Sequence, residues 1–505
     1  MIERVRREET WHRTAKDAYP DPYKIMRIQF PVVEELRDTP RETWPQPDAL
    51  PTALGYLAET FEDAGWPDLA RRTYYEMLEL RREAGPSEDL RRVLTALRTN
   101  LIRQELYEEA LPVALEGHAL AAQLAVPGRY NTVVANEARY WITDLLGKLG
   151  RHAEAARNAE EAVAELREQK PVKDGPPPGY SLAHAQLEYA QRLATIGDLE
   201  RAADSAAEAA AFWRQHSWEQ AVRLYTVLDE LSTLQLRLGR FEDARASHAE
   251  AVAVIRQRAE RKKEQEFLSH LAGALNNHAN RLHDMGLDAE AIEAAQESAD
   301  RYRELAANAE GRAMVMKTEL RAALALIGLA SRLHDVRRLD ESFAASDEAI
   351  ALATRYADKE LGRRELARAL TNRASALITR RAWAEAAEAA AKGLELYQTA
   401  HGKAMARNTF ALASAHAGQH DVALEASLQS VAEYREWHAA DPDGYAYLLA
   451  DALTDHARIR LLRAERAEAE AAITESLPLH EELAAANPGR YQRELDHARS
   501  VAAQI

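Results

Sequence analysis

Histidine and carboxylate side chains are the groups in this sequence that could support a metal site or acid–base catalysis. The chain contains 17 histidines and no cysteine. The best candidates for metal ligands are the cluster of His270, His278 and His283 and the run His480-Glu-Glu482. Spacings of eight and five residues do not put the three histidines on one stripe of a helix. We therefore expect no metal site and no cofactor.

The motifs that usually carry catalysis are missing. The sequence has no glycine-rich phosphate loop, no His-Glu-x-x-His pair and no serine elbow. The lack of cysteine excludes disulfides, thiolate nucleophiles and cysteine-ligated metal centres. The 81 acidic residues do not identify an acid–base pair, because such a pair needs a shared cleft and shifted pKa values. We expect that the protein is not an enzyme.

The charge balance argues against nucleic acid and anionic lipid as partners. Lysine and arginine number 65 against 81 aspartates and glutamates, which gives a formal net charge of −16. The basic run from Arg256 to Lys263 is interrupted by Glu260 and falls at the end of an expected helix, where positive charge is favoured. The sequence shows no apolar run long enough for a signal peptide or a membrane span. We expect a soluble, cytoplasmic protein.

The composition favours long helices that extend by repetition. Aromatic residues make up only 7% of the chain, and the 21 glycines and 18 prolines are few for 505 residues. That length is two to four times the usual size of a single domain, so the chain must either divide or repeat. We expect essentially no β-sheet.

A short pattern recurs ten times: a glycine or a substitute, followed five residues later by alanine or serine. Successive copies lie on average about 44 residues apart, which is enough for two helices and two short turns. The ten pairs are Gly65/Ala70, Glu105/Ala110, Gly150/Ala155, Gly197/Ala202, Gly239/Ala244, Gly286/Ala291, Arg337/Ser342, Arg381/Ala386, Gly418/Ala423 and Ala464/Ala469.

Two further positions in each copy carry small residues. Seven residues before the turn, and seven after the alanine, nine of ten residues are small, and the exceptions are Arg98 and Met77. Small side chains at fixed helical offsets let neighbouring helices approach closely, whereas a bulky residue would overpack the contact by ~1–3 kcal/mol. The pattern therefore predicts helices that pair and stack in a regular order.

Together these positions resemble the tetratricopeptide repeat (TPR) over residues 49 to about 487. The long period is similar to the variant of kinesin light chains and of many actinobacterial repeat proteins, and the stretch Ala274 to Gly286 is the best local match. The resemblance implies an all-α, right-handed α-solenoid of about ten helix pairs. It also implies binding of a protein or peptide rather than catalysis, without identifying the partner.

Both ends of the chain fall outside the repeat. Residues 1–48 include Trp11, Trp44 and several prolines, and we expect an N-terminal cap or linker with one or two short helices, or alternatively a partner-docking arm. Residues 488–505 are expected to form a C-terminal capping helix. Loops such as Pro442-Asp-Gly-Tyr445 and Pro488-Gly-Arg-Tyr491 precede new helices, and we expect their tyrosines to pack over the junction.

The TPR resemblance places the binding groove on the first helix of each pair. Side-chain amides there can donate and accept, which suits binding of the backbone of an extended peptide. The two lysines that hold a carboxylate tail in some relatives are missing, so recognition of a carboxylate tail is not expected. The asparagines expected in the groove are Asn276, Asn277, Asn280, Asn372 and Asn408.

A run of acidic residues is the second feature of the expected groove. Acidic side chains beside aromatic rings should attract a partner segment that contains lysine or arginine. The alternative is that the groove is simply solvated and the aromatic rings pack between helices. The residues expected to line this part are Glu137, Tyr140, Trp141, Asp144, Glu188, Gln191, Asp229 and Glu230.

The sequence therefore favours a bacterial, cytoplasmic adaptor or regulator that binds a peptide or partner protein in a concave groove. One alternative is a scaffold that self-associates into a homo-oligomer. Another is a sensor of a small molecule or signal peptide, which would act through a separate effector because the chain lacks a helix-turn-helix domain.

Overall fold

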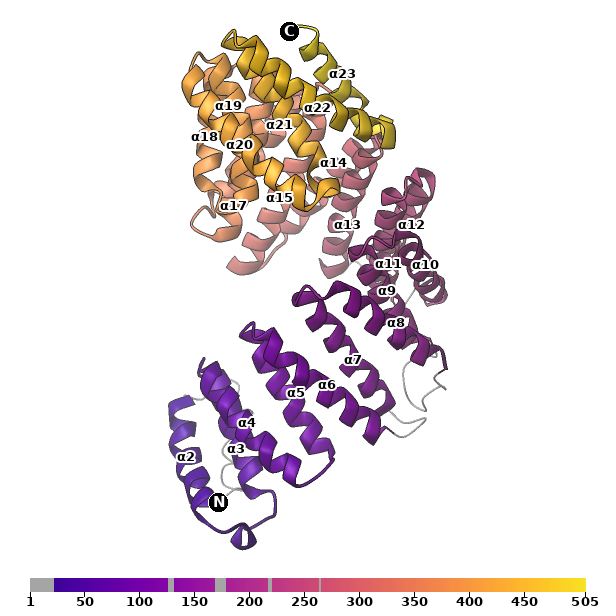
Figure 1. Cartoon of the computed structure of the whole chain (residues 1–505), viewed down its shortest axis with the longest axis vertical. Coiled ribbons are helices and arrows are strands. Elements are labelled where there is room, and N and C mark those ends of the chain that lie inside the picture. Colours follow the sequence, from indigo (N-terminus) through magenta and orange to yellow (C-terminus); the bar gives the residue numbers. More distant parts are fainter. Residues whose placement is uncertain (1–21, 126–130, 169–178, 217–219, 263–264) are drawn as a thin grey trace. The chain divides into compact units, whose positions relative to one another are not determined.

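The computed structural model describes residues 22–125, 131–168, 179–216, 220–262 and 265–505. Within these ranges the chain forms 22 α-helices and one short 3-10 helix, and no strand (Figure 1). The predicted all-α class is confirmed. No helix in the described part of the chain combines the length and apolar character needed to span a lipid bilayer.

The helices form two compact units, Met1–Gln215 and His216–Ile505. The boundary falls inside the predicted repeat region, at a position that the sequence pattern does not mark. The helices described in unit 1 are α2 (Pro22–Asp38), η1 (Arg41–Thr43), α3 (Ala49–Asp63), α4 (Pro67–Glu83), α5 (Glu88–Arg103), α6 (Tyr107–Leu124), α7 (Asn131–Lys148), α8 (His152–Glu168), α9 (Tyr180–Thr195) and α10 (Leu199–Gln215).

Unit 2 continues the series of helix pairs. In both units the odd-numbered helices from α3 to α21 are the first helices of the pairs, and the even-numbered helices that follow them are the second helices. Its helices are α11 (Ala221–Arg237), α12 (Phe241–Lys262), α13 (Gln265–Asp284), α14 (Asp288–Ala307), α15 (Arg312–Asp335), α16 (Leu339–Thr354), α17 (Glu360–Thr379), α18 (Trp383–Leu396), α19 (Ala400–His416), α20 (His420–Ala440), α21 (Pro442–Leu462), α22 (Arg466–Ala486) and α23 (Pro488–Ala502).

Each helix pair is joined by one residue in the left-handed region of backbone space. All ten predicted turn positions have a positive φ, including the four that are not glycine: Glu105 (59°), Arg337 (63°), Arg381 (63°) and Ala464 (60°). A residue with positive φ ends a helix and lets the chain reverse into the next one. The predicted register of the repeat is confirmed in all ten pairs.

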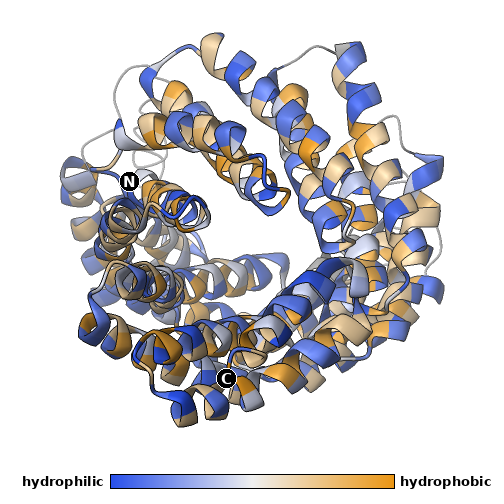
Figure 2. Ribbon diagram, turned by 90° about the horizontal axis from the view of Figure 1, so that it is seen from above, coloured by the Kyte–Doolittle hydropathy of each residue, from blue (hydrophilic) through white to orange (hydrophobic). Residues whose placement is uncertain are grey.

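The small residues of the pattern lie at the contacts between helices. The alanines five residues after each turn are fully buried, and Ser342 at the equivalent place is 1% exposed. Where serine replaces alanine, its hydroxyl donates to a backbone carbonyl, as Ser342 Oγ does to Ala330 O at 2.7 Å. Hydrophobic and hydrophilic residues alternate along the helices (Figure 2), so each helix buries one side against its neighbours.

Arg98 is the exception that the sequence pattern did not explain. It is 8% exposed and holds its guanidinium 4.6 Å from the centroid of the Trp141 ring. Burial, and to a smaller extent the charge of Arg91, lowers the pKa of Arg98 to about 10. A cation–π contact with a large ring therefore occupies the place that a small residue takes in the other pairs.

The N-terminal region contains the short helices that were expected. In α2 the residues Val32, Val33 and Leu36 are buried in the same apolar cluster as the residues of α3, and Trp44 Nε1 donates to Leu36 O at 3.0 Å. These contacts cover the first helix pair, which is the role of a cap. Trp11 lies outside the described residues.

The C-terminal helix α23 contacts more than its neighbour α22. Asn487 caps the helix by accepting from the Arg490 amide, and its own Nδ2 donates to Asp284 O at 2.6 Å. Arg493 Nη1 donates to Asp335 O, also at 2.6 Å. The contacts join α23 to the ends of α13 and α15, more than 150 residues earlier in the chain. Helix α23 therefore contacts two helices of unit 2 that are distant in the sequence, in addition to its neighbour α22.

The tyrosines that follow the Pro-Gly loops pack as expected. The Tyr491 ring lies 5.6 Å from the Tyr447 ring between centroids, and Tyr445 lies 5.6 Å from Trp437. Tyr180 likewise meets Trp213 edge-on at 5.1 Å. Their structural role is confirmed. The corresponding loop at residues 127–130 lies outside the described part of the chain.

Candidate binding site on the first helices of unit 2

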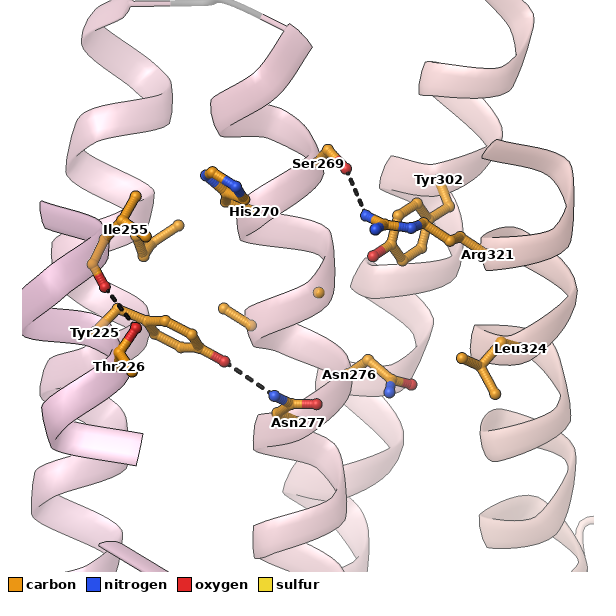
Figure 3. A pocket seen from close by; sticks show the side chains of 13 residues that line it. Tyr225, Thr226, Ile255, Ser269, His270, Asn276, Asn277, Tyr302, Arg321 and Leu324 are labelled. Atoms are coloured by element: carbon orange, nitrogen blue, oxygen red, sulfur yellow. Dashed lines mark hydrogen bonds between the residues drawn. The ribbon is translucent and has the colours of Figure 1, made fainter. Parts of the chain in front are cut away.

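A cavity of about 380 Å³ opens between α11 and α15. The first helices supply most of its lining, and the second helices α12 and α14 contribute only Ile255 and Tyr302 (Figure 3). This volume is at the small end of the range for ligand pockets, which is about 300–1,000 Å³. The lining residues are Val222, Tyr225, Thr226, Ile255, Ser269, His270, Gly273, Ala274, Asn276, Asn277, Tyr302, Arg321 and Leu324.

Two tyrosines define opposite sides of the cavity. The Tyr225 hydroxyl accepts a hydrogen bond of 3.0 Å from Asn277 Nδ2. Burial, followed by the nearby charge of Asp229, raises the pKa of Tyr225 to about 12, and burial also raises the pKa of Tyr302. Both rings therefore stay neutral at pH 7 and present a hydroxyl together with an apolar face.

Arg321 is the only permanently charged residue in the lining. Its Nη1 donates to Ser269 Oγ at 3.0 Å, and its guanidinium lies beside the Tyr302 ring (Figure 3). It has no carboxylate partner among the described residues. Gly273 keeps this corner open, because a Cβ there would lie 3.3 Å from the Tyr302 hydroxyl.

Two more polar groups in the lining lack a partner. The side-chain amide of Asn276 makes no hydrogen bond with any other described residue, and His270 Nδ1 is buried without one. No acidic residue lines the cavity. The site therefore combines apolar walls with convergent polar groups that the protein itself leaves unsatisfied.

The structure separates the five predicted asparagines. Asn276 and Asn277 line the cavity, whereas the other three lie away from it and are engaged by their own chain. Asn280 accepts from Arg332, Asn372 donates to Ile327 O at 3.4 Å, and Asn408 donates to Asp455 at 3.0 Å.

The acidic residues expected in unit 1 have basic neighbours. Asp144 Oδ2 lies 2.8 Å from Lys148 Nζ, and Glu188 Oε1 lies 3.5 Å from Arg192. Burial raises the pKa of Glu188 to about 7, against the opposing effect of Arg192. The described part of this surface is therefore less negative at pH 7 than its sequence suggests.

The aromatic residues of the same region contact one another. Tyr140 is 48% exposed and meets the Trp141 ring edge-on at 5.4 Å, while the other contact of Trp141 is with Arg98. Gln191 is exposed on α9. The side chain of Glu137 lies outside the described residues.

The remaining two acidic residues, Asp229 and Glu230, lie on α11 in unit 2. Asp229 Oδ1 is 3.3 Å from His248 Nδ1. Burial lowers the pKa of His248 to about 3, so the imidazole is neutral at pH 7 and the contact is not an ion pair. Burial also raises the pKa of Asp229.

The histidines considered as candidate metal ligands contact other side chains. His278 stacks on His248, with the ring centroids 5.0 Å apart, and His283 Nδ1 lies 3.0 Å from Asp288. His480 Nε2 hydrogen-bonds with Thr454 at 3.2 Å. Among the described residues no three potential ligands converge on one point.

Sequence reasoning missed the residues that shape the cavity most, namely Tyr225, Ser269, Tyr302 and Arg321. The groove residues expected from the sequence stand 6 to 13 residues before the turn of their helix pair, whereas Arg321 stands 16 residues before Arg337 and Ser269 stands 17 before Gly286. Both therefore lie about one helical turn beyond the expected positions. Tyr302 lies on a second helix, so no offset on first helices could have found it.

Comparison with known proteins agrees with this architecture. No family model matches the chain, and no curated protein is significantly similar to it in sequence. The apo form of RapI is similar in structure, with a TM-score of 0.50 and 12% identity over 76% of this chain and 97% of RapI. Together with the ten helix pairs, this likeness establishes a helical-repeat fold of the TPR type.

Two other solved structures show a weaker likeness. BtubC (BKLC) from P. vanneervenii is 16% identical, with a TM-score of 0.40 over 50% of this chain and 92% of BtubC. A tetratricopeptide repeat protein from Parabacteroides merdae is 13% identical, with a TM-score of 0.39 over 63% of this chain and 98% of that protein.

Proposed function

We propose that this protein is an interaction module that binds an extended peptide segment of a partner along the first helices α11, α13 and α15. The observation that supports this proposal most is the Asn276 amide, which lines a cavity and has no hydrogen-bond partner among the described residues. An amide can pair with both the N–H and the C=O of a peptide backbone. The cavity beside it is large enough for a side chain or a chain end but not for a folded domain.

The proposal is tested with peptides selected from a random display library against the full chain. The selected peptides should protect backbone amides of α11, α13 and α15 from hydrogen exchange more than those of α12 and α14. Asn276→Ala should weaken binding about tenfold, because the loss of one or two well-formed hydrogen bonds costs about 1.4 kcal/mol.

Gln296→Ala is the matched control. Gln296 is also an amide side chain, but it is exposed on the second helix α14 and hydrogen-bonds Asp300 at 3.0 Å. Binding should be unchanged in this variant. Peptides that bind equally well to the Asn276→Ala protein, and that protect only second helices, would refute the proposed surface.

A partner segment rich in lysine or arginine remains a prediction for the surface formed by α7 and α9. Its support is the exposed Tyr140 ring near Glu188 and Asp144. Partial burial, followed by the charges of Glu188 and Asp144, raises the pKa of that tyrosine. The role of a cytoplasmic adaptor or regulator in a bacterium likewise remains a prediction from the sequence.

A further inference from the structure

The cavity between α11 and α15 is lined by one positive charge, Arg321, and by no negative charge. Two arginines of the neighbouring helices have carboxylate partners: Arg256 lies 2.7 Å from Glu297, and Arg303 pairs with Glu348 at 2.6 Å. Arg321 is half-buried and has no such partner among the described residues. An arginine in this position presents a planar set of donors that matches a carboxylate.

From this pattern we propose that the cavity is a binding site for a carboxylate attached to an apolar group, with Arg321 as the counter-ion. This inference rests on the proposed function only in placing the ligand on the same helices. A single positive charge balances a carboxylate, whereas a phosphate at pH 7 carries a larger charge that would be left partly uncompensated. The absence of acidic residues from the lining removes any competing intramolecular partner.

Neighbouring polar groups complete the carboxylate site. Ser269 Oγ accepts from Arg321, so its own hydroxyl hydrogen remains available to a second oxygen. The Asn276 amide lies about two turns beyond Ser269 on α13, and Figure 3 shows it at the lower edge of the cavity, between Asn277 and Leu324. A carboxylate at Arg321 would therefore meet a fork of N–H donors together with a hydroxyl donor.

The rest of the cavity fits the apolar part of such a ligand. Ile255, Ala274 and Leu324 are aliphatic, and the faces of Tyr225 and Tyr302 extend that surface. Burial of one branched side chain there would contribute about 1.5–3 kcal/mol. Two sources could supply this chemistry: the C-terminal residue of a peptide, or a free organic acid of similar size. The first departs from the expectation from the sequence, which rested on two missing lysines and did not consider Arg321.

Calorimetric titration of the full chain with N-acetyl-leucine tests the proposal, because this probe carries one carboxylate on one branched side chain. N-acetyl-leucinamide has the same shape without the charge and should bind at least tenfold more weakly. Arg321→Gln should reduce the affinity for the acid at least tenfold and leave the affinity for the amide nearly unchanged.

Arg312→Gln is the matched control, because Arg312 is exposed at the first residue of the same helix and does not line the cavity. It should bind the acid as the wild type does. Thermal unfolding of both variants establishes that each is folded, and Ser269→Ala should lower the affinity several-fold without altering charge.

The two sources are separated by acetyl-Gly-Gly-Leu with a free or an amidated C-terminus. Tighter binding of the free tripeptide than of N-acetyl-leucine identifies a chain end, and equal binding identifies a free organic acid. Equal affinity for acid and amide, no binding of N-acetyl-leucine, or inorganic phosphate that competes at equal concentration would each overturn the carboxylate site. Library peptides that still bind on α11, α13 and α15 in that case would leave the proposed function standing.

Discussion

Two stretches of unit 2 differ in whether the polar side chains of their first helices have partners within the protein. Between α11 and α15 these side chains border an open cavity. Among the described residues Arg321 has no carboxylate partner, and the side-chain amide of Asn276 makes no hydrogen bond. On α21, Asp455 accepts from Arg458 at 2.8 Å and from Asn408 at 3.0 Å, and the Tyr447 ring lies in a tilted contact with Tyr491 of α23.

The C-terminal helix accounts for part of this difference, because the contacts of Tyr447 come from α23, whereas those of Asp455 come from α21 itself and from α19. Arg490 of α23 lies 5.5 Å from the Tyr447 ring, and Arg493 donates to Asp335 O. Near the end of unit 2, polar side chains of the first helix α21 are therefore paired within the chain. Near its beginning, the Asn276 amide lacks a hydrogen-bond partner and Arg321 lacks a carboxylate partner among the described residues. The α11–α15 stretch therefore combines an open cavity with polar groups that the described residues do not pair.

The largest effect is expected where α23 touches the turn between α13 and α14. Gly286 has φ +76°, and a Cβ there would lie 2.4 Å from Gly489 O, so Gly286→Ala would both strain the turn and displace α23. We expect it to lower the free energy of unfolding by about 3 kcal/mol in urea.

Gly239→Ala provides the control for that measurement. Gly239 has a similar φ of +71°, but nothing lies within 4 Å of its added Cβ. Only the backbone penalty of about 1 kcal/mol should remain. Equal losses in the two variants would mean that the contact with α23 contributes nothing to the stability of unit 2.

A pH-dependent effect is expected at Asp451, beneath α23. Burial, together with the charges of Asp455 and Glu494, raises the pKa of Asp451 above its ordinary value of 3.8. A raised carboxyl pKa destabilises the folded state as the pH rises above that value, and the penalty is absent below it. Asp451→Asn should therefore increase the free energy of unfolding by about 1 kcal/mol at pH 8.

The same substitution should have little effect at pH 3, below the ordinary carboxyl pKa of 3.8, where the carboxyl is largely protonated in both states. Urea unfolding of the two proteins at both pH values measures the difference, in which titrations common to both proteins cancel. A loss of stability at pH 8 would show instead that the charge of Asp451 is favourably paired with Arg458 or Arg490.

The smallest effect is expected at the turn between α21 and α22. Ala464 has φ 60°, and glycine would remove a strain of about 1–2 kcal/mol while adding about 0.5–1 kcal/mol of chain entropy in the unfolded state. Ala464→Gly should thus stabilise the protein by about 0.5 kcal/mol. Ala471→Gly, at an exposed place inside α22, should do the opposite by about 1 kcal/mol, and thermal unfolding of both distinguishes them.

The sequence predicted the helical repeat well because its signals are local. A turn and the residues seven and five positions from it belong to one helix pair, so the pattern constrains contacts formed by neighbours in the chain. This is why Glu105, Arg337, Arg381 and Ala464 were recognised as turn residues without being glycine.

The candidate site was predicted only in part, since Asn276 and Asn277 line the cavity but Arg321, Ser269 and Tyr302 were not foreseen. Whether a charged side chain is paired depends on what the neighbouring helices bring to it. Glu188 and Arg321 look equally available in the sequence, yet Arg192 lies beside the first and no described carboxylate pairs with the second.

The amino-acid sequence by itself determined the all-helical class, the ten turns and the burial of small residues, because these depend on periodic contacts within and between adjacent helices. Only the tertiary structure decided that α23 meets α13 and α15, and that one cavity of unit 2 stays open. Such contacts depend on the small rotation of each helix pair relative to the next. These rotations add up along the chain, and the sequence of a single repeat does not determine their total.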